Sequence, residues 1–421
     1  MSLNTVQRRR SRFRVSGRAR VAALAGSIAA GLSQRLGFGQ GSMIGGRVTL
    51  ALCPSMLTQL AAGRRVVLVS GTNGKTTTSH LLAAALRTAG LVAHNASGSN
   101  MPDGIVTALI AHPEAEFAVM EVDELHLAAV ADAVNPAVVV LLNLTRDQLD
   151  RTTEVRKIAG RIGEALARHA DTVVVANADD PITVQAAGKA AQTIWVAAGA
   201  GWREDAASCP NCGELLEDGE NGDWSCTCGL ARPPVTWELS DNLAHTAGHV
   251  VPLELQLPGR FNLSNATMAL VAAHQVAQIP FTAAAKAFAE LSEVANRYAI
   301  VRYGQHTVRL LLAKNPAGWV EMLSVLAEPR PLVVSINAQG ADGRDTSWLW
   351  DVPFERLTER PIAASGERAA DLGVRLSYAD LEHHTAPDPL AALALLPPGP
   401  VDVVANYTAF RQLTQRLVHV H

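Results

Sequence analysis

The segment Gly71-Thr-Asn-Gly-Lys-Thr-Thr-Thr78 has the composition and spacing of a loop that binds phosphate. Backbone N–H groups of a glycine-rich turn, together with the N-terminus of the following helix, bind phosphate oxygens. In such a loop Lys75 reaches the β- and γ-phosphates, and the Thr76 hydroxyl ligates Mg²⁺. The loop is a shortened Walker sequence, since Val69 stands where the full pattern has its first glycine. A plain glycine turn is the alternative, but Lys75 is one of five lysines in a chain with 31 arginines.

Four of the five cysteines form two short pairs, Cys209-Pro-Asn-Cys212 and Cys226-Thr-Cys228. Two thiolate pairs suit a tetrahedral Zn²⁺ site, and a glycine after each pair allows a tight turn. A site with four thiolates has no open position, so we expect a structural Zn²⁺ ion and no catalysis there. Reduced thiols in a loop are the alternative. The same pattern indicates a reducing, cytoplasmic compartment instead of a disulfide framework.

These motifs need a scaffold, and the chain alternates strand and helix patterns as in an α/β fold with a parallel sheet. A buried strand over residues 65–70 precedes the phosphate loop, and a helix over residues 76–88 follows it. Glu121 and Asn143 end later strands, and open α/β sheets bind ligands at that edge. We expect further strands at residues 117–122, 137–143, 172–176, 193–197, 331–337, 360–364 and 401–405, with a closing helix at 409–417.

Charge is unevenly distributed along the 421 residues. The net charge is −3, which argues against a strongly basic nucleic-acid binder, and no apolar run reaches the ~18–20 residues of a membrane span. The first acidic residue is Asp103, and residues 1–102 carry 13 Lys and Arg. An arginine-rich start followed by an apolar stretch at residues 21–32 predicts a basic arm that contacts an anionic membrane surface. A solvated tail is the alternative.

Four segments beyond the loop carry a family resemblance. They are Met120-Glu-Val-Asp-Glu124, Asn143-Leu-Thr-Arg-Asp-Gln-Leu-Asp-Arg151, Asn177-Ala-Asp-Asp-Pro181 and Phe261-Asn-Leu-Ser-Asn265. With the phosphate loop they resemble the Mur ligases and folylpolyglutamate synthetases, although Gln148 replaces the usual histidine. Those enzymes use ATP to convert a carboxylate into an acyl phosphate, which an amine then attacks.

The resemblance implies ATP and Mg²⁺ as cofactors. It places Lys75 and Glu121 in catalysis, with Thr76 and Glu121 on Mg²⁺. The implied nucleotide-binding residues are Gly71, Thr72, Asn73, Gly74, Lys75, Thr76, Thr77, Asn265 and Arg297. Two alternatives stay open: Glu121 as a surface glutamate, and Asn262 as the N-terminal cap of a helix.

The cysteine module and the C-terminal part narrow the resemblance. The C-terminal matches are Leu312-Ala-Lys-Asn-Pro-Ala-Gly318, Ala341-Asp-Gly-Arg-Asp-Thr-Ser-Trp-Leu-Trp-Asp351 and Ala405-Asn-Tyr-Thr-Ala409. The chain therefore resembles the MurT family, the synthetase subunits of lipid II isoglutaminyl synthase. The implied fold is a Mur-ligase-type central domain with a parallel sheet, an inserted zinc ribbon and a smaller C-terminal α/β domain. The implied reaction is ATP-dependent amidation of the D-Glu α-carboxylate of the lipid II stem peptide to D-isoglutamine, in peptidoglycan biosynthesis.

The nitrogen for that reaction must come from elsewhere. Glutamine hydrolysis requires an activated thiolate beside a histidine, four cysteines are assigned to metal, and Cys53 lacks a nucleophile-elbow context. The resemblance implies a heterodimer with a GatD-type glutamine amidotransferase subunit. It also implies that Asp345 orients the histidine of that partner's Cys–His pair. The alternatives are that Asp345 caps the segment after it or pairs with Arg344.

We expect three parts: a basic N-terminal arm at residues 1–44, an ATP-binding domain at 45–296 with a zinc ribbon inserted at 203–234, and a partner-binding α/β domain at 297–421. About 70 residues before the loop cannot form a domain that grips a UDP-linked precursor. This favours a lipid-linked substrate at the inner face of the plasma membrane. The alternatives are an amino-acid-adding ligase of the Mur or folylpolyglutamate type, a nucleotide-binding scaffold for an amidotransferase, and a P-loop NTPase acting on nucleic acid.

Overall fold

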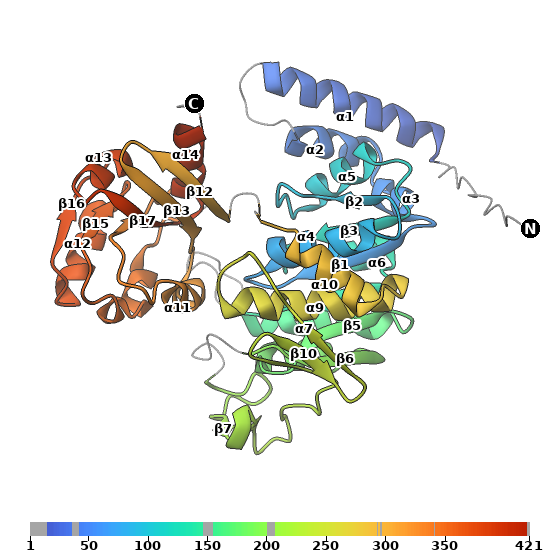
Figure 1. The fold of residues 1–421 in the computed structure, drawn as a ribbon. Coiled ribbons are helices and arrows are strands. Elements are labelled where there is room, and N and C mark those ends of the chain that lie inside the picture. The colour runs from blue at the N-terminus through green and yellow to red at the C-terminus, as the bar shows by residue number, and fades with distance from the viewer. Residues whose placement is uncertain are drawn as a thin grey trace, which may run out of the picture.

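The computed structural model describes residues 15–35, 42–145, 155–199, 207–292, 294, 297–340 and 342–418 (Figure 1). Two sheets, one of nine strands and one of six, organise this part of the chain, and a two-stranded sheet forms a small module of its own. The larger sheet carries the phosphate loop, and the smaller one forms the C-terminal domain.

The larger sheet has the order β11-β10-β9-β6-β5-β4-β1-β3-β2. Its strands are β1 (Arg65–Ser70), β2 (Val92–His94), β3 (Phe117–Glu121), β4 (Val138–Leu141), β5 (Val173–Asn177), β6 (Gln192–Ala197), β9 (Trp237–Ser240), β10 (Leu243–Thr246) and β11 (His249–Pro252). The first six are parallel, as expected for an α/β sheet, although the short strand β2 was not predicted. The expectation did not include β9, which joins β6 in parallel, or its antiparallel neighbours β10 and β11.

Helices cover both faces of this sheet because its central strands are apolar on both sides. Side chains alternate along β1: Val66 and Leu68 face one layer, and Val67 and Val69 face the other. The first layer contains α3 (Met56–Ala61), α5 (Pro102–Ala111), α6 (Leu127–Val134), α7 (Val155–Arg168) and α8 (Pro181–Ala187). The second contains α4 (Lys75–Arg87), α9 (Arg260–Ala277) and α10 (Phe281–Ala289). The strand registers Val69↔Glu121 and Ser70↔Leu141 bring the polar strand ends to one edge.

The C-terminal domain has the strand order β12-β13-β17-β14-β15-β16. Its strands are β12 (Tyr298–Tyr303), β13 (His306–Leu312), β14 (Leu332–Ser335), β15 (Ile362–Ser365), β16 (His383–Thr385) and β17 (Gly399–Ala405). All pairs are parallel except the β12–β13 hairpin. The expectation omitted this hairpin and the parallel edge strand β16. Helices α11 (Pro316–Val325) and α12 (Ala369–Tyr378) pack on one face, and α13 (Pro389–Ala394) and α14 (Tyr407–Val418) on the other.

Two helices, α1 (Gly17–Arg35) and α2 (Ser42–Leu52), precede the central domain, and the expected boundary at residue 44 falls inside α2. Gly26 allows α1 to pack closely on α2, since a Cβ on Gly26 would lie 2.6 Å from the carbonyl oxygen of Gly45. Next to α5, a Cβ on Gly46 would collide with the backbone of Asp103. The arginines at positions 8–14 lie outside the described residues. Among the described residues, none of the helices combines the length and apolar character that crossing a membrane requires.

The cysteine module lies between β6 and β9 and contains β7 (Glu217–Asp218), η2 (Glu220–Gly222) and β8 (Trp224–Ser225). Its described part begins at residue 207, so residues 203–206 of the expected insertion are outside the description. The module projects from the end of the central domain that is opposite to α1 (Figure 1).

Candidate active site

The phosphate loop joins β1 to α4, and its backbone depends on glycine. Gly71 and Gly74 have φ angles of +143° and +85°, which L side chains rarely adopt. Gly74 is the N-cap of α4, and a Cβ on it would collide with the side chain of Asn265 from α9. The loop is therefore shaped by its own glycines and by the start of α9, two of the sequence segments that carried the resemblance.

The end of β4 holds the loop from the other side. The backbone N–H of Asn73 donates to Asn143 Oδ1 at 2.9 Å, and Asn143 Nδ2 donates to the Asn73 carbonyl at 3.1 Å. Thr72 is held in the same way, because its N–H donates to the Asn143 carbonyl at 2.8 Å. Residues 146–151 of the Asn143 segment, including Gln148, lie outside the described residues.

Lys75 is buried and turned toward its own loop. Its ammonium donates to the carbonyl oxygens of Gly71 and Thr72 and to Glu124 Oε2, the last at 3.2 Å. Glu124 is equally buried, so the two form an ion pair with little solvent around it. Glu124 was not among the predicted site residues, although Glu124 and Glu121 both belong to the Met120–Glu124 segment. The Glu124 carboxylate balances the positive charge of Lys75.

Thr76 and Glu121 lie side by side at the start of α4. The Thr76 hydroxyl donates to Glu121 Oε2 at 2.8 Å, and Arg297 Nη2 donates to the same hydroxyl at 3.0 Å. Glu121 is 1% exposed, which excludes the alternative of a surface glutamate. Asn100 Nδ2 donates to Glu121 Oε1 at 3.2 Å, and Asn95 bonds the Glu121 backbone; our sequence analysis missed both asparagines.

This pair fits a Mg²⁺ ion. Adjacent ligands in an octahedral Mg²⁺ shell, each at 2.0–2.1 Å from the ion, lie about 2.9 Å apart. The hydroxyl and carboxylate oxygens of Thr76 and Glu121 are 2.8 Å apart and need only small shifts to become such ligands.

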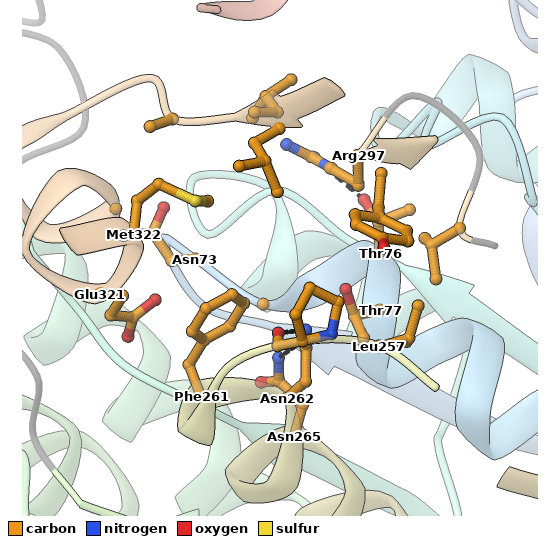
Figure 2. A pocket seen from close by; sticks show the side chains of 18 of the residues that line it. Asn73, Thr76, Thr77, Leu257, Phe261, Asn262, Asn265, Arg297, Glu321 and Met322 are labelled. Carbon is orange, nitrogen blue, oxygen red and sulfur yellow. Dashed lines mark hydrogen bonds between the residues drawn. The ribbon is translucent and has the colours of Figure 1, made fainter. Parts of the chain in front are cut away.

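Two adjoining cavities open beside the loop, between the central and C-terminal domains. Both are lined by Asn73, Gly74, Phe261, Asn265 and Glu321. Figure 2 shows Thr76 and Arg297 on one side of the first cavity and Glu321 from α11 on the other. Burial raises the pKa of Glu321 to about 7.

Further predicted residues line the first cavity. Thr77 and Asn262 are among them. Asn262 is not the N-cap of α9, because Gly259 holds that position and the Asn262 amide donates to the Pro258 carbonyl at 2.6 Å.

A direct contact joins the loop to the C-terminal domain. The side-chain amides of Asn73 and Asn315 exchange hydrogen bonds of 3.3 Å in both directions. Asn315 also caps α11 through Oδ1, which accepts from the Gly318 N–H at 2.9 Å. A shift of α11 is thereby coupled to the phosphate loop.

The four predicted metal ligands come together. The Sγ atoms of Cys209 and Cys228 are 3.5 Å apart, those of Cys212 and Cys226 are 3.4 Å apart, and all four lie within 4.8 Å of one another. A tetrahedral site with Zn–S bonds of 2.3 Å needs S···S separations of about 3.8 Å. The backbone N–H of Cys228 lowers the pKa of the Cys226 thiol to about 7. The cluster has the size and donor set of a Zn²⁺ site.

The cysteine module is anchored beside the second cavity. The indole of Trp224 donates to the Ala178 carbonyl at 3.3 Å, and Arg232 pairs with Asp179 at 2.8 Å. Asp179 in turn accepts from the backbone N–H of Gly199, a lining residue of that cavity. The Asn177–Pro181 turn thus links the module to the cleft.

Asp345 lies on the surface of the C-terminal domain, and its hydrogen bond to Ser347 does not involve the phosphate loop. Its loop is fixed by buried Asp342, which accepts from the Thr408 N–H at 2.9 Å. Asp345 Oδ1 accepts from the Ser347 N–H at 2.8 Å, which lowers the pKa of the carboxyl group. The alternative that Asp345 caps the following segment therefore describes a real contact. That segment is the short helix η3 (Ser347–Asp351), in which Trp348 is buried and Trp350 exposed.

Comparisons with known proteins agree with this geometry. A family model of the Mur ligase middle domain matches residues 69–273, and one of the MurT ligase C-terminal domain matches residues 312–410. The chain is 31% identical over 342 residues to the lipid II isoglutaminyl synthase (glutamine-hydrolyzing) subunit MurT of Staphylococcus aureus, covering 75% of this chain and 78% of that one. It is 30% identical over 374 residues to the subunit of the same name from Streptococcus pneumoniae, with coverages of 80% and 82%.

Solved structures show the same fold at lower identity. A pseudomurein peptide ligase type C from Methanothermus fervidus has a TM-score of 0.67 and 18% identity, covering 85% of this chain and 79% of that one. MurF from Acinetobacter baumannii has a TM-score of 0.65 and 19% identity, with coverages of 89% and 80%. The expected Mur-ligase-type α/β fold is confirmed.

Proposed function

The chain belongs to the MurT family, and from this membership we propose that it is the ATP-dependent synthetase subunit of a lipid II isoglutaminyl synthase. In this reaction the α-carboxylate of D-Glu in the stem peptide is amidated to D-isoglutamine. The family membership matches the resemblance that the phosphate loop, the cysteine pairs and the C-terminal segments carried. This amidation is part of peptidoglycan synthesis.

The first chemical step energises the carboxylate. A carboxylate oxygen attacks the γ-phosphorus of ATP, the bond from that phosphorus to the β-phosphate oxygen breaks, and ADP leaves with the bonding electrons. Lys75 lies at the base of the loop, where its ammonium exchanges part of its contact with Glu124 for the incoming phosphate. Arg297, already at the Thr76 hydroxyl, adds a second positive charge at the same place.

Thr76 and Glu121 would hold the Mg²⁺ ion for this step, because their side-chain oxygens have the spacing of adjacent ligands. When bound, the ion neutralises charge on the phosphate oxygens. Asn100 and Asn95 keep the Glu121 carboxylate and backbone in place, so that the carboxylate does not depend on the ion for its position.

The second step transfers nitrogen. Ammonia attacks the acyl carbon, phosphate leaves, and the nitrogen loses a proton to give the amide. We propose that a GatD-type glutamine amidotransferase supplies this ammonia and that Asp345 orients its catalytic histidine. The exposed position of Asp345 supports this role, because a carboxylate on the surface is accessible to a second chain.

An aromatic patch close to Asp345 in the sequence supports the partner as well. Trp350 and Tyr378 are 53% and 73% exposed, and their rings meet at 5.2 Å between centroids. Arg375 lies 5.6 Å from the Trp350 ring. Arg375 is buried, whereas Trp350 and Tyr378 are exposed, and exposed Trp and Tyr are among the residues enriched at protein interfaces.

The cysteine cluster is proposed to hold one structural Zn²⁺ ion. It anchors β7 and β8, which are too short to form a stable module alone. Metal analysis of the purified chain is expected to give one zinc per chain. Replacement of Cys209 and Cys226 by serine removes the ion, whereas Cys53→Ser leaves the zinc content unchanged.

The observation that carries the proposal is the joint placement of Lys75, Thr76, Glu121 and Arg297 at a cleft between two domains. A scaffold that only docks a partner has no need for this set. The test incubates the purified chain with ATP, Mg²⁺ and a muropeptide whose stem peptide contains D-Glu with a free α-carboxylate. We expect amidation with ammonium from the chain alone, and with glutamine only after the partner subunit is added. Phosphate release without amidation, or addition of an amino acid, would contradict the proposal.

A further inference from the structure

Helix α1 has an unusual distribution of side chains. Its inner face, against α2, is made of small residues: Ala19, Ala22 and Gly26 are all buried. Its outer face carries the large apolar residues Val21, Leu24, Ile28 and Leu32, which are 67%, 64%, 55% and 54% exposed. A helix that served only to cover the core would place these side chains inward. The outer face of α1 is therefore built for contact with something else.

The four apolar residues form one continuous stripe. At 100° per residue they fall within an arc of about 80°, on a helix about 28 Å long. Arginines flank the stripe: Arg18 and Arg20 at its N-terminal end, and Arg35 at its C-terminal end. All three are exposed. We call Val21, Leu24, Ile28 and Leu32 the α1 stripe.

The α1 stripe is held at one edge of the molecule. The Thr49 hydroxyl of α2 donates to the Ala22 carbonyl of α1 at 3.4 Å, and Arg18 Nε of α1 donates to the Leu52 carbonyl of α2 at 2.8 Å. Figure 1 shows α1 lying along the outside of the central domain, beyond α2 and α5. The stripe thus faces outward as a rigid part of the protein.

Charge decides which partner fits. No acidic residue precedes Asp103, so α1, α2 and the arginine-rich segment before them carry only positive charge. A second copy of α1 packed on the stripe would bring arginines of the two copies together without a compensating carboxylate. An anionic lipid surface has the opposite charge and an apolar layer just beneath it.

We propose that the α1 stripe docks on an anionic phospholipid bilayer, with the four apolar side chains in the headgroup–acyl boundary and the flanking arginines at lipid phosphates. The purpose of this docking rests on the proposed function, since a lipid-linked substrate lies in that surface. The docking itself requires no substrate. It would orient α1 in the plane of the bilayer and bring the central domain to the membrane.

The test is sedimentation of the full chain with vesicles of phosphatidylcholine alone or with 30% phosphatidylglycerol. We expect binding to the anionic vesicles and a decrease as salt is raised. Leu24→Glu/Ile28→Glu is expected to weaken binding at least tenfold, and Arg20→Gln/Arg35→Gln to remove most of the preference for anionic lipid. The matched control is Leu215→Glu/Val250→Glu, which changes two other exposed apolar residues and leaves binding unchanged.

Three outcomes would overturn the proposal. The first is a wild type that binds no vesicles at all, and the second is a Leu24→Glu/Ile28→Glu variant that melts like the wild type and still binds vesicles equally well. The third is a wild-type dimer in solution that the same variant converts to monomer, which would make the α1 stripe an interface between copies. Amidation of a water-soluble muropeptide is expected to be unchanged in this variant. A failure of membrane docking is thus distinguishable from a failure of the proposed reaction, which would appear in that assay for the wild type.

Discussion

Two carboxylates of this chain, Glu121 and Asp345, occupy opposite kinds of environment. Glu121 is buried and contacted by Thr76 and Asn100, in a cluster where Lys75 and Arg297 supply positive charge. Asp345 is exposed and contacts the Ser347 backbone next to it. This difference accords with the two roles we propose: Glu121 belongs to a site that energises a carboxylate within this chain, and Asp345 belongs to a site that acts only when a second protein covers it.

The largest effect is expected from Lys75→Ala. Removal of the ammonium takes away charge stabilisation at the transferring phosphate, so product formation falls about 10³–10⁴-fold. The loss is the same with ammonium and with glutamine plus partner, because both routes need the acyl phosphate. Lys286→Ala, an exposed lysine on α10, is the matched control. A Lys75→Ala variant that stayed active with either nitrogen source would contradict the proposed role of Lys75 at the transferring phosphate.

Asp345→Asn is expected to affect one nitrogen source alone. Glutamine-dependent amidation by the complex falls about 10³-fold, because the partner's histidine loses its orienting acid. Ammonium-dependent amidation stays within about twofold of the wild type, since the phosphate site is untouched. Asp351→Asn provides an exposed control in the same segment. Equal losses in both assays would remove Asp345 from the role proposed here.

Glu124→Gln tests whether the buried pair prepares Lys75 for phosphate. Without nucleotide, the variant removes the carboxylate charge that pairs with the buried Lys75 ammonium, and the free energy of unfolding is expected to fall by about 2–3 kcal/mol. ATP supplies new negative charge, so the deficit shrinks when ATP is added. Chemical denaturation with and without ATP measures both values. Asp132→Asn breaks an exposed pair with Arg168 and should cost less than about 1 kcal/mol. A deficit that ATP leaves unchanged would refute this view of Glu124.

The smallest effect concerns pH. Burial raises the pKa of Glu321 from its ordinary 4.5 to about 7, so between these values the folded chain binds a proton that the unfolded chain has lost. The contribution of Glu321 to stability is therefore favourable at low pH and is lost as pH rises through this window. Glu321→Gln is expected to flatten the pH dependence by on the order of 1 kcal/mol, measured by denaturation at pH 5 and pH 8. An unchanged slope would show that the carboxylate titrates normally.

The sequence predicted the parts of the site that lie within one motif. Lys75 and Thr76 follow from the glycine loop, Glu121 from its place at a strand end, and the cysteine cluster from its spacing. Glu124 was missed because its pairing with Lys75 depends on two strand ends meeting at one edge of the sheet, which a single segment does not reveal. Asn95 and Asn100 were missed for the same reason, although their loop is rich in Asn, Ser and Gly.

The fold shows a similar division. Most buried parallel strands were recognisable from their apolar runs, but β2 has only three residues and was missed. Strands β9–β11 and the β12–β13 hairpin are exposed on one side and give weaker patterns. Trp348 and Trp350 are two positions apart, a spacing that puts side chains on one face of a strand, but both lie in the short helix η3, where one is buried and the other exposed. Helix α1 was obscured because its apolar side chains point away from the core.

The most direct test of the central claim is to trap the energised carboxylate with hydroxylamine. The isolated chain is incubated with ATP, Mg²⁺, a D-Glu-containing muropeptide and hydroxylamine, without partner and without glutamine. We expect a peptide hydroxamate at the α-carboxyl group, formed together with one phosphate per hydroxamate and absent in the Lys75→Ala variant. If the hydroxamate appeared only after the partner and glutamine were added, the chain would not activate the carboxylate by itself, and the account would be contradicted.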